Sequence, residues 1–349
     1  MKYVCSRCHR EESITTRHAK CACGGLWRLD YRPPAFTADD IDRAEWSQFR
    51  YHRYMALNSD AWRAVSMGEG MTPVIRFDDN VLLKMDYLMP TLSFKDRGAA
   101  VLVAHCKSIG VEKVVQDSSG NAGNSVAAYC ARAGIACEIF VPEGTSPKKI
   151  NMIEAHGAIA NVVPGSRDHC ADVCRAKVEA EGVYYANHVY NPFFYEGTKT
   201  YIYEVYEQLG RIPQHLIIPV GNGTLFLGVM QALEHLLASG VIAQMPTIIA
   251  VQSEYCDPLL RAAVRYESEP AAITPQPPKV SPSASRCAAR RFSPMRQNTA
   301  CASSTRRKKT SCTRGRYWQH AVFTASTPLL RTTPPTCTIA PNTARRRIA

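Results

Sequence analysis

Strand-like and helix-like stretches alternate along the chain from residue 95 to residue 252. Short runs rich in valine and isoleucine are each followed by a longer stretch with helical periodicity. Regular alternation of this kind is typical of a largely parallel sheet that is covered by helices on both faces. We therefore expect the α/β class with doubly wound parallel sheets, in which ligands bind at the carboxyl ends of the strands. The expected strands are 111–115, 135–141, 159–163, 183–189, 216–220 and 247–252, and the expected helices are 95–110, 125–133, 146–155, 168–180, 196–209 and 224–238.

Length and the absence of certain patterns narrow the class further. The chain has 349 residues, which is enough for two domains. It contains no apolar run of about 18 residues and no secretory signal pattern. We therefore expect a cytoplasmic protein with no membrane partner, whose 14 cysteines are thiols or metal ligands rather than disulfides.

The positive charge is concentrated at the C-terminal end. The formal net charge is +12, yet residues 280–349 hold 14 of the 42 lysines and arginines and none of the 30 acidic residues. The rest of the chain therefore carries 28 basic and 30 acidic residues. A basic tail of this kind indicates either a nucleic-acid-binding arm or a disordered segment.

Two pairs of cysteines lie near the N-terminus. Cys5 and Cys8 are separated by two residues, and Cys21 and Cys23 by one, with two glycines directly after the second pair. Four thiolates on tight turns suit one tetrahedral Zn²⁺, although four unrelated cytosolic thiols remain the alternative. We favour a structural zinc ribbon, because a closed site with four sulfur ligands leaves no open position for catalysis.

A single lysine stands out at the start of the alternating region. Lys95 lies between Phe94 and a run of small apolar residues that predicts a buried helix, with Ser93 as its expected cap and Gly98 allowing close packing. Burial and the helix dipole both lower the pKa of such an amine and make it a nucleophile of the Schiff-base type. An ordinary surface lysine beside Asp96 is the alternative.

Two turns between a strand and a helix complement this lysine. Residues 118–124 contain two serines, two asparagines and two glycines, whose backbone N–H groups and hydroxyls suit a carboxylate. Residues 221–224 form a compact Gly-Asn-Gly-Thr turn that suits a single phosphate on a helix dipole. Either turn alone is common for steric reasons, but together with Lys95 they supply the three contacts that pyridoxal phosphate requires.

The order of these motifs resembles a known family. Residues 93–98, 119–124 and 221–224 are similar to motifs of the threonine synthase branch of the tryptophan-synthase-β-like (fold type II) pyridoxal phosphate enzymes. The resemblance covers residues of about 68 to 260, and it implies an internal aldimine at Lys95. It further implies that the cofactor contacts are Phe94, Lys95, Asn121, Gly221, Asn222, Gly223 and Thr224, and that the substrate carboxylate faces Ser118, Ser119, Gly120 and Asn124.

One segment departs from the family pattern. Residues 191–200 resemble a threonine synthase segment that usually reads Asn-Pro-x-Arg-x-x-Gly-Gln-Lys-Thr, but Phe194 occupies the arginine position and Thr198 the glutamine position. Arginine is the usual bidentate phosphate ligand, so its loss weakens O-phosphohomoserine as the substrate. Two activities therefore stay open: threonine synthesis from O-phosphohomoserine and water, and deamination of serine or threonine by an ammonia-lyase.

The tail after Pro277 does not resemble the family. Codons permitted for residues 279–293 and 322–336, read one base earlier, are compatible with the peptides EGIAVGIPMRGAKIL and GFYCEHTTAANYAAY. Both peptides resemble consecutive C-terminal stretches of the family in one common frame. We interpret the tail as the product of a frameshift near residues 277–279, which removes the family's Glu-His-Thr-Thr stretch and makes the activity of this chain doubtful.

These observations give a domain scheme. We expect a zinc ribbon at 1–30, an N-terminal helical linker at 31–66, and a pyridoxal phosphate-dependent catalytic region of two α/β lobes at 67–278, incomplete at its C-terminal end. Residues 279–349 are expected to be a disordered basic tail with little regular secondary structure. The expected partner is a small amino-acid substrate, with a homodimer if the chain is intact. A non-catalytic zinc-ribbon protein with a nucleic-acid-binding tail is the alternative from another class, supported only by the tail charge.

Overall fold

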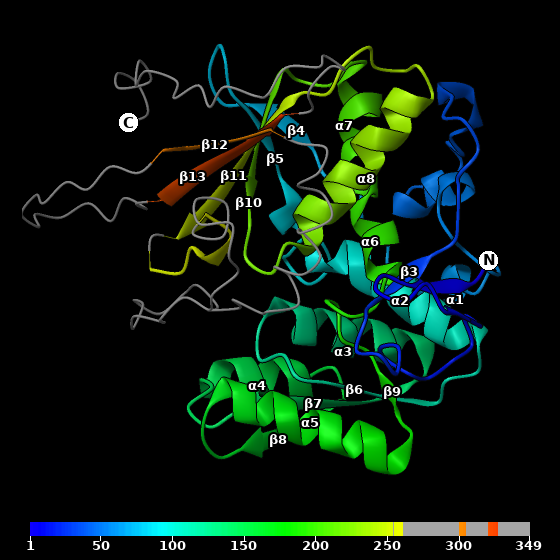
Figure 1. Ribbon diagram of the computed structural model, residues 1–349, viewed down its shortest axis with the longest axis vertical. Coiled ribbons are helices and arrows are strands. Elements are labelled where there is room, and N and C mark those ends of the chain that lie inside the picture. The colour runs from blue at the N-terminus through cyan, green and yellow to red at the C-terminus, as the bar shows by residue number, and fades with distance from the viewer. Residues whose placement is uncertain (254, 261–299, 305–319, 327–349) are drawn as a thin grey trace, which may run out of the picture. The chain divides into compact units, whose positions relative to one another are not determined.

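The computed structural model describes residues 1–253, 255–260, 300–304 and 320–326 (Figure 1). The chain divides into two compact units. The first comprises Met1–Ile212 and Leu227–Ala243, and the second comprises Pro213–Phe226 and Gln244–Ala349. Within the described ranges no helix is both long enough and apolar enough to cross a membrane.

A four-stranded parallel sheet in the first unit has the strand order β8-β7-β6-β9. Strand β9 is shorter than the expected stretch 183–189, because the side chain of Asn187 accepts hydrogen bonds from the backbone N–H groups of Val189 and Tyr190 and turns the chain away. The strands are β6 (Lys113–Gln116), β7 (Ala136–Pro142), β8 (Ile159–Val163) and β9 (Tyr184–Tyr185).

Helices cover both faces of this sheet. Val114 of β6 belongs to an apolar cluster with residues of α2 and α3, whereas Val115, the next residue, packs with Cys170 and Cys174 of α5. Successive side chains of a strand point to opposite faces, so this division places α2 and α3 on one side and α5 on the other. The expected α/β class with a parallel sheet is thus confirmed. The helices are α2 (Lys95–Ser108), α3 (Asn121–Ala133), α4 (Pro147–Glu154) and α5 (Arg167–Glu181).

Three further helices follow the sheet. The helix expected at 196–209 begins earlier, as α6 (Phe193–Thr198), and continues as α7 (Thr200–Leu209) after Lys199, whose backbone is also helical. Helix α8 (Thr224–Ala238) lies where expected. The hydroxyl of Tyr203 on α7 lies 2.8 Å from Nδ1 of His235 on α8, which ties the two helices together within the first unit.

The N-terminal part of the first unit contains small elements. Strands β1 (Tyr3–Cys5), β2 (Glu11–Glu12) and β3 (Trp27–Leu29) form an antiparallel sheet with β1 in the centre. The helical linker expected at 31–66 consists mainly of the 3-10 helices η1 (Ala38–Asp40) and η2 (Gln48–Tyr54), followed by the single turn α1 (Trp62–Val65). Strands β4 (Val74–Arg76) and β5 (Leu82–Lys84) then pair as a hairpin before the 3-10 turn η3 (Asp86–Leu88).

The second unit contains a mixed sheet with the order β10-β11-β13-β12. Strands β10 (His215–Pro219) and β11 (Thr247–Ser253) are parallel, as expected. Strands β13 (His320–Ser326) and β12 (Ala300–Ser304) add to β11 in antiparallel fashion, which differs from the expectation of little regular structure in the tail. The run Val-Phe-Thr in β13 has high strand propensity, and pairing satisfies the edge of β11. The remainder of that expectation falls outside the described residues.

Candidate active site

Lys95 is the first residue of α2 and is 9% exposed. Its Nζ lies 4.6 Å from the centre of the Phe94 ring and 5.6 Å from that of Phe194. Burial lowers the pKa of the Lys95 amine from 10.5 to about 7, so a large fraction of the amine is uncharged at neutral pH. The expected cap is wrong, because Phe94 is the N-cap residue and the Ser93 hydroxyl makes no hydrogen bond to the helix. The amine is therefore a nucleophile in an apolar setting.

Helix α6 packs tightly on α2 at two glycines. A Cβ atom on Gly98 would lie 2.3 Å from the Phe194 ring, and a Cβ atom on Gly197 would lie 1.8 Å from the carbonyl oxygen of Arg97. Both contacts are possible only because these positions carry no side chain. The close packing predicted for Gly98 is confirmed, and its consequence is that Phe194 lies beside Lys95.

The turn between β6 and α3 lies next to the start of α2. A Cβ atom on Gly123 would lie 1.9 Å from the carbonyl oxygen of Ser118, so glycine lets the turn fold against the helix. The hydroxyl of Ser125 on α3 donates a hydrogen bond to the carboxylate of Asp96, which links the first turns of the two helices. In this turn Ser118 and Asn124 are buried, Ser119 and Gly120 are half-buried, and Asn121 is exposed.

A polar pair beside Lys95 was not foreseen from the sequence. Gln116 ends β6, and its Nε2 donates to the carbonyl oxygen of Ala186 and lies 3.4 Å from Nδ1 of His188. An amide nitrogen can only donate, so Nδ1 of His188 accepts and the imidazole is neutral. Burial, together with the positive charges of Lys95 and Arg167, holds the pKa of His188 well below its usual value. The parallel pairing of β6 and β9 is the signal that could have placed these residues together.

Asp117 fixes the chain directly before the turn. Its Oδ1 accepts hydrogen bonds from the Tyr185 hydroxyl at 2.6 Å and from Nδ2 of Asn187 at 2.7 Å. Both donors come from β9 or the residues just after it, so the ends of two parallel strands are tied at the edge where α/β proteins bind ligands.

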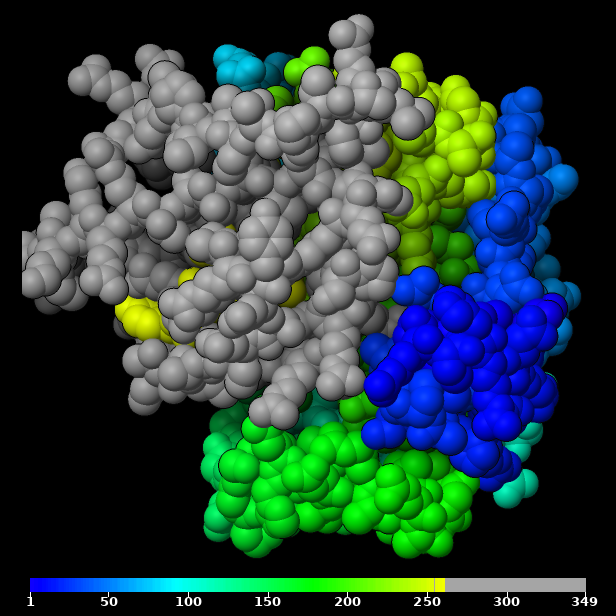
Figure 2. All heavy atoms as spheres, viewed as in Figure 1, coloured from blue at the N-terminus to red at the C-terminus, as the bar shows by residue number. Residues whose placement is uncertain are grey.

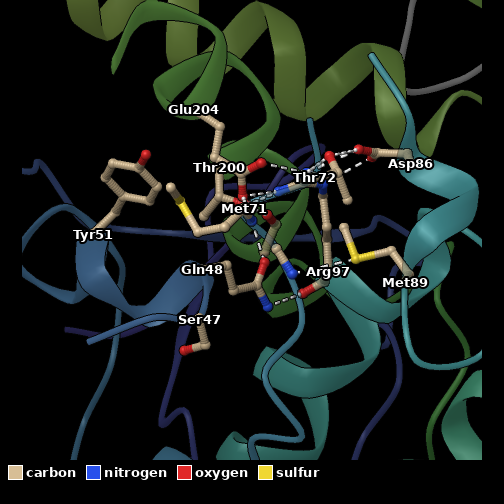
Figure 3. A network of polar contacts seen from close by, with 12 residues as sticks. Ser47, Gln48, Tyr51, Met71, Thr72, Asp86, Met89, Arg97, Thr200 and Glu204 are labelled. Carbon is tan, nitrogen blue, oxygen red and sulfur yellow. Dashed lines mark hydrogen bonds and ion pairs between the residues drawn. The ribbon is translucent and has the colours of Figure 1, made fainter. Parts of the chain in front are cut away.

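The start of α2 is also held by a buried ionic network (Figure 3). Arg97 donates to both carboxylate oxygens of Glu204, at 2.6 and 2.8 Å, and to both oxygens of Asp86, at 2.9 and 2.8 Å. Although burial alone would raise it, the pKa of Glu204 is lowered to about 2 by Arg97 and Lys84. Gln48 completes the contacts by donating to the carbonyl oxygen of Arg97. These bonds fix the helical turn that carries Lys95.

The second turn of interest belongs to the second unit. Residues 221–224 join β10 to α8, and Gly223 has a φ of +85°, which favours glycine. The backbone N–H and the hydroxyl of Thr224 both donate to Oδ1 of Asn222, at 3.2 and 3.0 Å. Asn222 and Thr224 are both buried. The turn thus begins a 15-residue helix, the kind of position at which proteins bind phosphate.

The four N-terminal cysteines gather in one place, within the part of the chain drawn in dark blue in Figure 2. Their sulfur atoms all lie within 4.8 Å of one another, with 3.4 Å between Cys5 and Cys23 and 3.6 Å between Cys8 and Cys21. In a tetrahedral site with Zn–S bonds of about 2.3 Å, neighbouring sulfurs lie about 3.8 Å apart. The donor set and its spacing therefore fit a single zinc ion.

A buried lysine at a helix start, beside the glycine-rich turn at the end of a parallel strand, defines the class of site in which a cofactor aldehyde is bound. Comparison with known proteins agrees with this class. The sequence pattern of the family described as "Pyridoxal-phosphate dependent enzyme" matches residues 65–311, and the chain belongs to this family. The match continues beyond Pro277, where the resemblance was expected to stop.

The chain is similar to threonine synthases in particular. It is 29% identical to that of Methanocaldococcus jannaschii, over 74% of this chain and 67% of the relative, and 37% identical to that of Halalkalibacterium halodurans, over 45% and 47%. For the Mycobacterium leprae threonine synthase the identity is 32%, over 58% of each chain. The chain thus spans about half to two thirds of the length of these relatives.

Solved structures share the fold. Diaminopropionate ammonia lyase from Escherichia coli matches with a TM-score of 0.56 and 18% identity, over 74% of this chain and 72% of that one. A bacterial threonine deaminase matches with a TM-score of 0.50 and 26% identity, over 60% and 68%.

The residues of the first unit fit the family's cofactor. Beside the buried amine of Lys95, the Asn124 Oδ1 and the Ser93 hydroxyl are buried and have no hydrogen-bond partner among the described residues. A Cβ atom on Gly120 would meet nothing within 4 Å, so the turn offers open space to a bound group. Unsatisfied buried polar atoms are costly, and a bound group that hydrogen-bonds them removes that cost.

Proposed function

We propose that the chain is a lyase of the threonine synthase type, which uses pyridoxal phosphate to convert O-phosphohomoserine and water to threonine and phosphate. The observation that carries this proposal is the buried Lys95 amine, whose pKa of about 7 makes it a nucleophile at neutral pH. The similarity to threonine synthases supports this choice among the reactions of the family.

Each candidate residue then has a role. Lys95 binds the cofactor through its amine and afterwards carries protons as general base and acid. Asn121 lies near the cofactor ring, Phe94 packs beside the amine, and residues 221–224 hold the phosphate. The turn residues Ser118, Ser119, Gly120 and Asn124 bind the substrate carboxylate through N–H and hydroxyl groups. When bound, the cofactor supplies an electron sink for charge that develops on the substrate's α carbon.

The four-cysteine ribbon holds a structural zinc ion in this proposal. Its sulfur atoms fill all four positions of a tetrahedron, so the metal contributes folding free energy rather than chemistry.

An ammonia-lyase that acts on serine or threonine is the second candidate. The apolar ring of Phe194, which lies 5.6 Å from Nζ of Lys95, favours it, because an aromatic ring cannot pair with a phosphate dianion. The threonine deaminase among the similar structures supports the same reading.

Product analysis with two substrates tests these candidates. Purified protein supplied with pyridoxal phosphate is given O-phosphohomoserine or threonine, and released phosphate and 2-oxo acid are measured. Phosphate and threonine from the first substrate support the synthase, whereas 2-oxobutanoate from threonine supports the ammonia-lyase. If neither forms, while the Lys95→Ala variant captures the cofactor as well as the native chain, the proposal fails.

A further inference from the structure

The ribbon contacts the catalytic region through the ring of Tyr3. Tyr3 lies in β1, two residues before Cys5, and it stacks on Trp27 of β3 with 5.8 Å between ring centres. Its edge meets Phe193 of α6, with ring centres 6.1 Å apart. On its other contact, Phe193 stacks on His105 of α2 at 3.7 Å. A continuous row of rings therefore joins the ribbon to α6 and α2.

These contacts are buried. Tyr3, Trp27 and Phe193 are each 3% exposed or less, and they share one apolar cluster with Cys5 and Cys21. The same cluster includes the apolar residues of α2 and α3. Where the ribbon meets residues 184–192 there is a cavity of about 10 Å³, room for about one water molecule. The ribbon core is thus part of the core behind the candidate active site.

Phe193 is bonded directly to Phe194. Phe194 fills the space above Gly98 and lies 5.6 Å from Nζ of Lys95. A shift of Phe193 along α6 therefore moves the ring that packs against the nucleophilic amine. Interiors are close-packed, so such a shift is transmitted rather than absorbed.

We propose that the metal-bound ribbon positions the catalytic lysine, with Tyr3 and Phe193 as positioning residues. The inference rests on the proposed attachment of pyridoxal phosphate to Lys95 and on a metal ion at the four cysteines. About 30 residues are too few to hold a fold by their own core, so the metal fixes β1 and with it Tyr3. Loss of the metal frees Tyr3, and the wall of rings behind Phe194 and Lys95 loosens.

The test uses the full chain and measures chemistry at Lys95 without turnover. Zinc-loaded protein is mixed with pyridoxal phosphate, samples are reduced with borohydride at intervals, and the modified Lys95 peptide is quantified by mass spectrometry. Removal of zinc with a chelator is expected to slow capture roughly tenfold, since a displacement of about 1 Å at a reacting group can cost more than that. Added zinc should restore the rate.

Variants separate positioning from general loss of structure. Tyr3→Leu should slow capture with zinc still bound, whereas Tyr3→Phe, which keeps the ring, should restore it. Lys2→Ala is the matched control, because it removes only exposed ion pairs, with Glu11 and Asp30, next to the same strand. Circular dichroism should show the helices of every variant intact.

The outcomes are distinct. Equal capture rates in zinc-loaded, zinc-free and Tyr3→Leu protein would overturn the inference while leaving the proposed function in place. A chain that binds no zinc would also overturn it, since the agent is missing. If the zinc-loaded native chain fails to modify Lys95, the proposed function falls, and the inference falls with it.

Discussion

The ring of Phe194 occupies the space that Gly98 leaves open on α2, where a Cβ atom would lie 2.3 Å from the ring. This contact decides how closely α6 approaches α2, and it places an apolar ring at the candidate catalytic lysine. It therefore joins the packing of the first unit to the chemistry of its site.

Gly98→Ala is expected to destabilise the protein by about 1–3 kcal/mol, because the added methyl group overpacks the contact with Phe194. Urea unfolding measures the free energy. The double variant Gly98→Ala, Phe194→Leu should recover part of the loss, since leucine is smaller and can move away. Purely additive effects of the two substitutions would show that the two residues do not share this space.

Glu204→Gln should cost about 3–5 kcal/mol of unfolding free energy, because it leaves buried Arg97 and Lys84 without their shared carboxylate. Glu181→Gln, which breaks only an exposed pair with Lys177, is the control and should cost less than about 1 kcal/mol.

The same carboxylate predicts acid sensitivity. The pKa of Glu204 is about 2 in the folded chain against an ordinary value of 4.5. Its stabilising contribution is therefore complete above the ordinary value and is lost as the pH falls from about 4.5 towards 2. Glu204→Gln should flatten the stability profile in that window, and an unchanged profile would contradict the assignment.

The zinc site predicts a metal content of about one Zn²⁺ per chain, measured by elemental analysis of purified protein. Replacing Cys5 and Cys8 by serine should remove the metal and lower the melting temperature, because binding free energy contributes to folding. Cys256→Ser, outside the ribbon, should leave the metal in place. Metal-free native protein of unchanged stability would argue against the ribbon.

The frameshift hypothesis predicts the DNA sequence of codons 270–285. We propose that a one-base change near residues 277–279 restores a frame that encodes the peptide EGIAVGIPMRGAKIL. Sequencing this region of the source DNA decides the matter. Codons that rule out the shifted peptide would mean that the basic tail is the native C-terminal sequence.

Much of the fold was predictable because its signals are local. The alternation of 111–163 depends on apolar periodicity within each stretch, and the strand at 159–163 has the expected bounds. Gly98 and Lys95 were likewise found from neighbouring residues. The ionic network was not, because Glu204 lies 107 positions from Arg97 and no local pattern joins them. His188 was missed for a similar reason, since Asn187 ends β9 early and turns the histidine towards the end of β6.

The pKa of Lys95 gives the site a defined pH dependence. Since burial lowers this pKa from 10.5 to about 7, the uncharged amine appears as the pH rises through about 7 rather than through 10.5. The rate of cofactor capture should follow that curve. The unfolded chain binds the proton more tightly, so Lys95 also makes stability rise with pH between about 7 and 10.5, a slope that Lys95→Met should reduce.

The most direct measurement is identification of the lysine that pyridoxal phosphate modifies. The protein is incubated with the cofactor near neutral pH, reduced with borohydride, digested and analysed by mass spectrometry, beside Lys95→Ala and the control Lys107→Ala at the far end of the same helix. The account predicts one modified residue, Lys95, with the visible absorbance of the bound cofactor lost in Lys95→Ala and kept in Lys107→Ala. Retention of the same reducible adduct in Lys95→Ala would contradict it.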